Sequence, residues 1–462
     1  MAQAVLSLGA AIVLARILSP DAFGVFAMAV PLGVVANQVA GQAFQTTLLQ
    51  REGLTNEEAS DLFRFAVRIN LGVAGAMAIA GVALAAFYRE PRLPAVVVPW
   101  ALITWLLTIT TFQEALLKRS LRFPAVMLAQ FVALVTGIAA AVGAAQAGAG
   151  YWALPIQLFV TEVVRALGVA RASRWIPKRW TAGVGGADEL RRSWRSVVGY
   201  SLTTWLADQP DLLAVGRVGA HALGLYDTAR RWARYPFEEP YLILGDLAVA
   251  GARGAGDPAA VQRFLTRTVM ATLTLSLPAI AFVGATAPEL VPVLLGAQWT
   301  DAIPLLRMLC VVAFAGALSR VAYWIPLARG ASSLLLRWTA FVQLPATVCA
   351  VLVGLRWGPM GVARALAVVT TLLVIPCFVM LTRAGSVRVW DLAGAVWRPV
   401  VASLAAAAAV LGVDAGQGPR NRLLLAFGVF LSAFVATWLL LPGGVAQARS
   451  MARNVRTLGS AP

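Results

Sequence analysis

Long apolar runs separated by short charged breaks occupy nearly the whole chain. A helix needs about 20 mostly apolar residues to cross the hydrocarbon core of a bilayer, and most of these runs reach or approach that length. The pattern predicts an all-α polytopic membrane protein with about 14 transmembrane helices. We expect them at 1–18, 23–46, 63–87, 95–116, 123–147, 151–172, 197–217, 223–249, 264–287, 303–327, 338–356, 361–382, 397–413 and 423–442.

Two breaks carry local signals for the start of a helix. Ser19 precedes Pro20, which places an N-cap residue before a proline at the first helical position. Thr55 and Glu58 have the spacing of a capping box. At the first residues, Met1–Ala15 is apolar with no basic start, so we expect a spanning helix there and not a cleaved signal peptide.

The chain repeats two short patterns in its two halves. The pattern Arg16–Ala29 returns, one residue shorter, at Arg217–Ala229, and Arg64–Arg68 is echoed by Arg263–Arg267. Such self-similarity is typical of duplicated transporter bundles. It predicts two six-helix lobes in a pseudo-two-fold arrangement around a central cavity. The expected parts are an amino-terminal lobe at 1–172, a basic cytoplasmic linker at 173–196, a carboxyl-terminal lobe at 197–382, two additional helices at 383–442 and a basic cytoplasmic tail at 443–462.

Composition agrees with a membrane protein and gives its orientation. Hydrophobic residues make up 60% of the chain and charged residues 13%, against about a quarter charged in soluble domains. The net charge of +17 does not indicate nucleic-acid binding, because the arginines sit mostly in short breaks, as the positive-inside rule describes. Placing both termini in the cytoplasm leaves few basic residues in the outer breaks, namely Arg89, Arg92, Arg217, Arg356, Arg420 and Arg422.

The linker combines arginines with Trp175, Trp180 and Trp194. An amphipathic segment of this kind can lie on an anionic inner leaflet, which makes anionic membrane lipids a candidate partner. The simpler interpretation is an orientation signal with ordinary interfacial tryptophans. The sequence leaves both interpretations open.

Charged residues gather in the eighth apolar run, where Asp227, Arg230, Arg231, Arg234 and Glu238 lie. Charges inside a span are costly and mark cavities by default. Their three- and four-residue spacings put them on one broad helix face. Because guanidinium groups bind phosphate oxygens bidentately, we predict that the three arginines bind a phosphate-bearing substrate. The alternative is that the acids neutralise the arginines as structural pairs.

Other charged residues inside the runs have less specific roles. Asp208 and Asp211 are three positions apart, and they either form ion pairs with Arg230 or Arg234 or carry a coupling proton or sodium ion. Glu162 and Arg165 have the spacing of a neutralising pair, whereas Glu114 and several further charges are scattered.

Catalytic and metal-binding patterns are absent from the sequence. It has no Gly-rich phosphate loop, no nucleophile elbow and only one histidine, His221. The cysteines Cys310, Cys349 and Cys377 all lie inside apolar runs, without metal-binding spacing. We therefore expect a carrier and not an enzyme, with no metal and no cofactor beyond a coupling ion.

Three segments resemble a known family. Leu14–Ala29 is similar to the amino-terminal signature of bacterial polysaccharide transporters, the Wzx-like oligosaccharide flippases, and Asp211–Tyr226 and Leu290–Trp299 resemble later motifs of that family. The family belongs to the multidrug/oligosaccharidyl-lipid/polysaccharide superfamily. The resemblance implies translocation of undecaprenyl-pyrophosphate-linked oligosaccharide units across the bacterial inner membrane by alternating access. These units feed O-antigen, capsule or exopolysaccharide assembly, and a polysaccharide polymerase and other assembly proteins are the implied protein partners.

Two other functions remain open. One is an ion-coupled multidrug or cation antiporter of the same superfamily, with Asp208 and Asp211 as coupling acids; the arginines of the eighth run argue against a cavity for cationic drugs. The other is a membrane polymerase or ligase acting on lipid-linked sugars. Such enzymes tend to have a sizeable outer loop, and the largest outer break, 288–302, is short.

Overall fold

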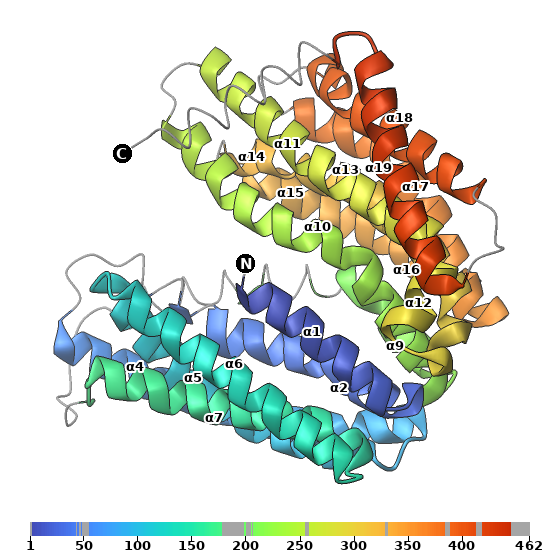
Figure 1. Ribbon diagram of the computed structural model, residues 1–462. Helices are drawn as coiled ribbons and strands as arrows, with labels where there is room; N and C mark the ends of the chain where they lie inside the picture. The colour runs from blue at the N-terminus through green and yellow to red at the C-terminus, as the bar shows by residue number, and fades with distance from the viewer. Residues whose placement is uncertain are drawn as a thin grey trace. The chain divides into compact units, whose positions relative to one another are not determined.

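The computed structural model describes residues 2–42, 44–45, 48, 55–177, 198–199, 205, 207–254, 258–328, 331–383, 389–412 and 418–444. Regular structure in these ranges is entirely helical (Figure 1). Nine helical stretches within them are long and apolar enough to cross a membrane, and two shorter apolar helices accompany them. The prediction of an all-α polytopic membrane protein is confirmed. The chain forms two compact units, Met1–Asp227 and Thr228–Pro462.

The first unit is built around α5 (Leu93–Arg119), which packs against α2 (Pro20–Asn37), α4 (Asn56–Tyr88) and α7 (Ala153–Ser173). The remaining elements of this unit are α1 (Ala2–Ile17), the π-helical η1 (Gln38–Gln42), α6 (Phe123–Gln146), the 3-10 turn η2 (Gly150–Trp152) and α9 (Pro210–Gly216). Helix α10 (Ala220–Gly254) begins in the first unit and continues into the second.

The second unit contains several helices that are interrupted or short. Helix α11 packs against α13 and α18, and α17 packs against α13 and α16. Its elements after α10 are α11 (Pro258–Ala285), α12 (Ala287–Leu294), η3 (Ala297–Ala302), α13 (Ile303–Val321), α14 (Trp324–Ala328), α15 (Ser332–Trp338), the π-helical η4 (Thr339–Gln343), α16 (Leu344–Gly354), η5 (Leu355–Trp357), α17 (Gly358–Arg383), α18 (Val389–Leu411) and α19 (Pro419–Leu440).

Both predicted caps are confirmed. The Ser19 hydroxyl accepts a hydrogen bond from the backbone N–H of Ala22 at 3.3 Å. At the start of α4, the Thr55 hydroxyl accepts from the Glu58 N–H at 3.2 Å, and the Glu58 carboxylate accepts from the Thr55 N–H at 2.9 Å. This reciprocal pair satisfies two backbone donors that a helix N-terminus otherwise leaves unpaired. Helix α4 therefore begins at Asn56, seven positions before the apolar run predicted it to begin.

The predicted outer break at 288–302 contains short helical segments. Helix α12 and the 3-10 turn η3 fill this segment, and Leu290, Val291 and Trp299 are buried. The side chain of Glu289 pairs with Arg422 of α19 at 2.5 Å. This ion pair connects the segment to a helix far along the chain.

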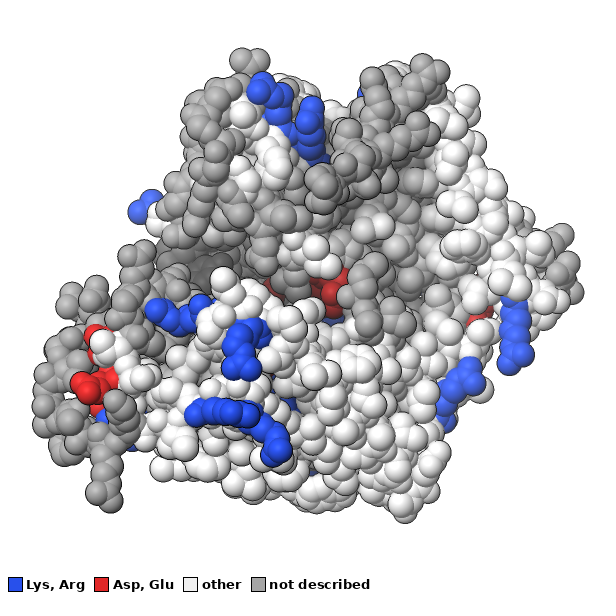
Figure 2. Space-filling view, turned by 60° about the vertical axis from the view of Figure 1, so that its left-hand side comes forward, with Lys and Arg blue, Asp and Glu red and all other residues white. Residues whose placement is uncertain are grey.

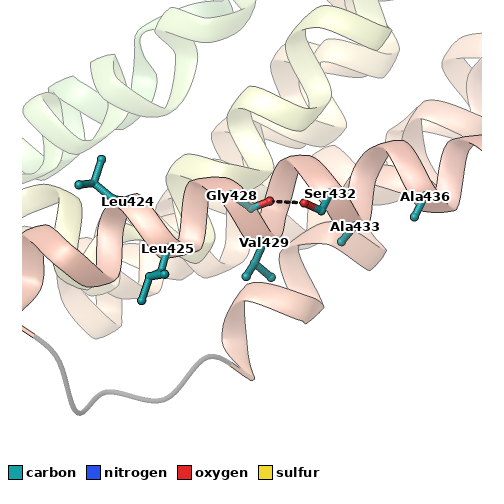
Figure 3. Close-up of a pocket in the computed structure, with 7 residues that line it drawn as sticks. All are labelled: Leu424, Leu425, Gly428, Val429, Ser432, Ala433 and Ala436. Carbon is teal, nitrogen blue, oxygen red and sulfur yellow. Dashed lines mark hydrogen bonds between the residues drawn. The ribbon is translucent and has the colours of Figure 1, made fainter.

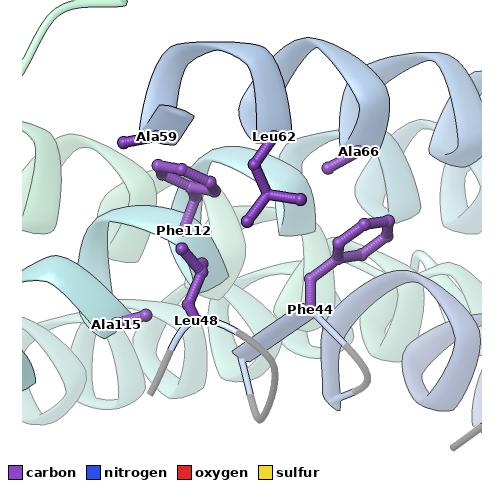
Figure 4. Close-up of a cluster of buried hydrophobic side chains, with 7 residues drawn as sticks. All are labelled: Phe44, Leu48, Ala59, Leu62, Ala66, Phe112 and Ala115. Carbon is purple, nitrogen blue, oxygen red and sulfur yellow. The ribbon is translucent and has the colours of Figure 1, made fainter. Parts of the chain in front are cut away.

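A cluster of buried apolar side chains joins the start of α4 to the end of α5 (Figure 4). Trp175 packs against it, with ring centroids 5.0 Å from Phe112 and 5.6 Å from Phe63. Trp175 therefore contributes to a core inside the protein. Trp180 and Trp194, and with them most of the predicted linker, lie outside the described residues.

The two copies of the repeated pattern pack against each other within the first unit. A Cβ atom placed on Gly24 of α2 would lie 1.7 Å from the carbonyl oxygen of Ala220. The equivalent Cβ on Gly224 of α10 would lie 1.8 Å from the carbonyl oxygen of Pro20. Pro20 and Ala220 occupy matching positions of the repeat, so the contact is reciprocal. Only glycine allows two helix backbones to approach this closely.

Candidate functional site

Helix α10 brings the predicted arginines to one face. Arg234 Nε lies 2.9 Å from Glu238 Oε1, one helical turn away, and the two side chains are 27% and 48% exposed. Arg230 is half-buried and Arg231 is exposed on the same broad face. The predicted i,i+4 pairing of Arg234 with Glu238 is therefore present in the structure.

The neighbouring face of α10 is apolar and closely packed. Ala229, Ala233 and Phe237 are all buried, at 2%, 0% and 5% exposure. This face anchors the helix, so the charged face is left out of the packed core. A charged side chain in a span costs roughly 2.5–3.5 kcal/mol on insertion scales, and more in simulations. The charged residues of α10 thus lie beside a packed apolar face of the same helix.

An aromatic stack that the sequence did not predict fixes the carboxyl-terminal half of α10. Tyr241 stacks on Trp324 of α14 with centroids 5.1 Å apart, and Phe237 lies 5.0 Å from Tyr241. Gly245 makes room for the indole, since a Cβ there would lie 2.8 Å from Trp324 Nε1. Tyr241 is two helical turns after Arg234, so the stack holds the register of the helix segment that carries Arg234 and Glu238. Trp324 is distant from Tyr241 in the sequence, so no local pattern predicted their contact.

Two of the predicted acidic residues, Asp211 and Asp227, are more buried than the arginines. Asp211 and Asp227 are 5% and 3% exposed, and Asp208 is half-buried. The hydroxyl of the fully buried Tyr226 donates to Asp211 Oδ2 at 3.1 Å. Asp208 and Asp211 flank a helix interruption at Gln209, directly before α9 begins at Pro210. The Tyr226 hydroxyl thus positions the Asp211 carboxylate within the first unit.

The structure also joins charges that the sequence left scattered. Arg165 of α7 lies 2.7 Å from Glu114 of α5 through Nε, and 3.5 Å from Glu162 through Nη1. Lys118 Nζ is 3.8 Å from the second carboxylate oxygen of Glu114. Glu114 is 1% exposed and Glu162 is 6% exposed. The sequence spacing indicated the Glu162–Arg165 pair, but Glu114 is too far along the chain for any local pattern to include it.

On the face of the molecule that Figure 2 shows, the described residues are largely uncharged. Figure 2 shows charged side chains in small separate groups between wide uncharged areas. A groove of about 590 Å³ runs along α19 (Figure 3) and has only one hydroxyl, Ser432, which donates to the Gly428 carbonyl at 2.7 Å. Exposed Leu424 and Leu425 line it, as on a lipid-facing helix surface. In the described ranges, no three His, Cys, Asp or Glu side chains are placed to hold a metal ion.

Solved structures with the same fold are transporters. The chain superposes on the lipid II flippase MurJ in an inward closed conformation with a TM-score of 0.72, at 10% identity, covering 94% of this chain and 96% of that one. It superposes on an inward-facing multidrug transporter of the MATE family with a TM-score of 0.64, at 15% identity, covering 85% and 96%. At these identities the likeness shows the fold alone.

Sequence comparisons place the chain more narrowly. It is 26% identical over 345 residues to the succinoglycan biosynthesis transport protein ExoT of Rhizobium meliloti (strain 1021), covering 74% of this chain and 69% of that protein. The family model described as "Polysaccharide biosynthesis protein" matches residues 13–304, which is more than half of the chain. The chain is therefore a member of the polysaccharide biosynthesis protein family.

Proposed function

We propose that this protein is a flippase that moves undecaprenyl-pyrophosphate-linked oligosaccharide units across the bacterial inner membrane by alternating access. The observation that carries the proposal is the charged face of α10, which presents Arg230, Arg231 and Arg234 in a chain of this family. A pyrophosphate bears several anionic oxygens close together, and adjacent guanidinium groups match that geometry. The ExoT and MurJ comparisons support a lipid-linked sugar as the substrate class.

The ion pair of Arg234 with Glu238 fits this role. A guanidinium group has five N–H donors, so Arg234 binds a phosphate oxygen while its Nε stays with Glu238. Glu238 holds the arginine in place when no substrate is present and offsets part of its charge. Because binding and release have to alternate, a partly compensated arginine suits a carrier better than an isolated one. No bond of the substrate is broken in this scheme, so the protein is not an enzyme.

The distribution of basic residues supports the orientation that we propose for the chain in the membrane. Both termini lie in the cytoplasm, and the lipid-linked unit moves from the inner to the outer leaflet for O-antigen, capsule or exopolysaccharide assembly. Anionic lipids surround the protein. A polymerase and other assembly proteins take over the translocated unit.

The test is polysaccharide export in a strain that lacks its own copy of this transporter. Arg234→Ala should lower export at least tenfold while the protein still inserts in the membrane, because the anchoring charge is lost. Arg234→Lys should restore part of the activity, since it keeps the charge without the bidentate geometry. Arg364→Ala removes an exposed arginine of α17 and is the matched control, with export expected to stay normal.

Two results would contradict the proposal. Normal export by inserted Arg234→Ala would show that α10 does not hold the substrate. A change in drug resistance, measured in an efflux-deficient strain, together with normal export would favour the antiporter.

A further inference from the structure

In the first unit, the buried carboxylates of Glu114 and Glu162 form a network with half-buried Arg165. Glu162 lies near the middle of α7, roughly 14 Å from its first residue and 16 Å from its last at the helical rise of 1.5 Å per residue. Ionisable groups at such depth in a transporter commonly carry protons or ions. The hydrogen-bonding partners of the two glutamates show which of them is suited to gain a proton.

Glu114 is surrounded by donors only. Its Oε1 accepts from Arg165 Nε at 2.7 Å and from Gln130 Nε2 of α6 at 3.2 Å, and Lys118 lies beside Oε2 at 3.8 Å. None of these groups can accept a hydrogen bond from a protonated carboxyl at these atoms. Glu114 therefore has no acceptor for a carboxyl proton among these groups, and it holds Arg165 in place.

Glu162 has a different environment. Its closest cation is Arg165 Nη1 at 3.5 Å, which is longer than a good charge-assisted hydrogen bond. Its second partner is the Thr110 hydroxyl of α5, within hydrogen-bond reach of Oε1. The same hydroxyl lies 3.2 Å from the Leu106 carbonyl oxygen. A hydroxyl can donate one hydrogen bond and accept others, so Thr110 has two acceptors available for a single proton.

This arrangement satisfies both protonation states of Glu162. When Glu162 is ionised, Thr110 donates to Oε1. When Glu162 is protonated on Oε1, its O–H donates to Thr110, and the Thr110 hydroxyl turns to donate to Leu106. No hydrogen bond is lost, and Arg165 stays paired with Glu114. The proton comes from water and returns to water, so no other reactant is needed.

We propose that Glu162 is the proton-binding residue of the first unit and that its protonation and release drive the transport cycle. The groups that face Glu162 are Thr110 and Glu114 from α5 and Arg165 from α7, and Glu114 is contacted in turn by Lys118 of α5 and Gln130 of α6. The proposal rests on the proposed transport function and specifies its coupling ion. It assigns the coupling proton to Glu162 of α7 and not to Asp208 or Asp211.

The experiment is infrared difference spectroscopy of the purified full-length protein across a pH series. A protonated carboxyl gives a carbonyl band that a carboxylate lacks, at a frequency that depends on its hydrogen bonds. We expect a band from buried Glu162, separate from those of exposed carboxyls, to rise as the pH falls. Glu162→Gln should remove it, because glutamine mimics the protonated state and donates to Thr110. Glu289→Gln is the control, since it removes another buried glutamate that is ion-paired, to Arg422 at 2.5 Å. The band should persist in that variant.

Thr110 gives a second, independent variant. Thr110→Val removes the acceptor for the protonated acid, so the carbonyl band should shift in frequency, whereas Thr110→Ser should keep the wild-type frequency. A band that persists in Glu162→Gln, or that has the wild-type frequency in Thr110→Val, overturns the assignment. This readout does not require substrate, so it is independent of the Arg234→Ala result.

Export measurements test the link to transport. A protonophore should lower wild-type export and leave any residual export by Glu162→Gln unchanged. Loss of the infrared band in Glu162→Gln, together with wild-type export and wild-type sensitivity to the protonophore, would overturn the coupling role.

Discussion

Tyr226 is fully buried, and its hydroxyl donates a hydrogen bond to the buried carboxylate of Asp211 at 3.1 Å. Tyr226→Phe keeps the ring and removes the donor, so we expect a loss of about 1–3 kcal/mol of stability, the typical cost of leaving a buried polar group without that partner. Thermal unfolding of the purified protein in detergent measures the effect. Tyr151→Phe removes a half-buried hydroxyl and is the control. Equal unfolding midpoints for wild type and Tyr226→Phe would contradict this role.

The turn between α4 and α5 contains an ion cluster that makes stability depend on pH. Arg92 lies 2.7 Å from both Glu90 and Asp21. The hydrogen bond from Arg92 lowers the pKa of Glu90 below its ordinary value of 4.5 and outweighs the opposing effect of burial. A lowered pKa stabilises the folded protein above the ordinary pKa, and this contribution is lost as the pH falls through the lowered value.

Glu90→Gln tests this dependence. The variant should unfold at a lower temperature than wild type at neutral pH, and the difference should shrink as the pH is lowered from about 5 toward 3. Unfolding midpoints across that range measure it. Asp61→Asn, which removes an acid paired with Arg64 by an i,i+3 contact on α4, serves as a comparison for general acid effects. A difference that stays constant with pH would rule out the Glu90 contribution.

At the residue scale, local partners could be predicted from sequence and distant ones could not. Ser19 and Thr55 bond to groups three positions away, and Arg234 pairs with Glu238 four positions away. These spacings follow directly from helix geometry. Glu114 and Arg165 are on different helices, so their contact depends on how α5 and α7 pack. The sequence identifies both charged residues, but it does not predict that they are in contact.

At the element scale, the close approach of α2 to the start of α10 depends on two glycines. Gly24→Ala would place a methyl group 1.7 Å from the Ala220 carbonyl oxygen, and Gly224→Ala would place one 1.8 Å from that of Pro20. Backbone atoms would have to move, and overpacking of this kind costs about 1–3 kcal/mol. We expect both variants to lower the unfolding temperature and the amount of inserted protein.

Gly72→Ala on α4 is the matched control, because no atom lies within 4 Å of its Cβ position outside its own helix. Alanine favours a helix over glycine by about 1 kcal/mol, so this variant should match or exceed wild type in stability. If Gly24→Ala and Gly72→Ala behave alike, the reciprocal contact does not contribute to stability.

Hydropathy located most helices but not the irregular helical segments. The apolar run at 23–46 predicted one helix, whereas α2 passes into the π-helical η1 at Gln38. Likewise, the run at 338–356 contains η4 before α16 begins at Leu344. An apolar count does not distinguish these backbone conformations, because each buries similar side chains. Their positions are set by neighbouring helices, which a single run does not reveal.

At the scale of the whole molecule, the repeated pattern predicted a duplicated chain, and the chain has the fold of the lipid II flippase MurJ. The predicted linker at 173–196 and tail at 443–462 lie mostly outside the described residues, so the proposed domain boundaries stay predictions. The two compact units divide between Asp227 and Thr228, inside α10. A continuous helix thus joins them, and the charges that we assign to the substrate follow directly after the junction.

The orientation of the chain in the membrane can be tested on a single hairpin helix. One end of α6 is flanked by Lys118, Arg119 and Arg122, while the turn at the other end, Ala147–Ala149, has no basic residue. The positive-inside rule therefore places Ser120 in the cytoplasm and Ala147 outside. Both positions are exposed.

In a background with Cys310, Cys349 and Cys377 replaced by serine, an impermeant maleimide applied to intact spheroplasts should label Ala147→Cys and not Ser120→Cys. Permeabilised cells should show labelling of both, which controls for accessibility. The opposite labelling pattern would reverse the orientation, and the proposed direction of transport would reverse with it.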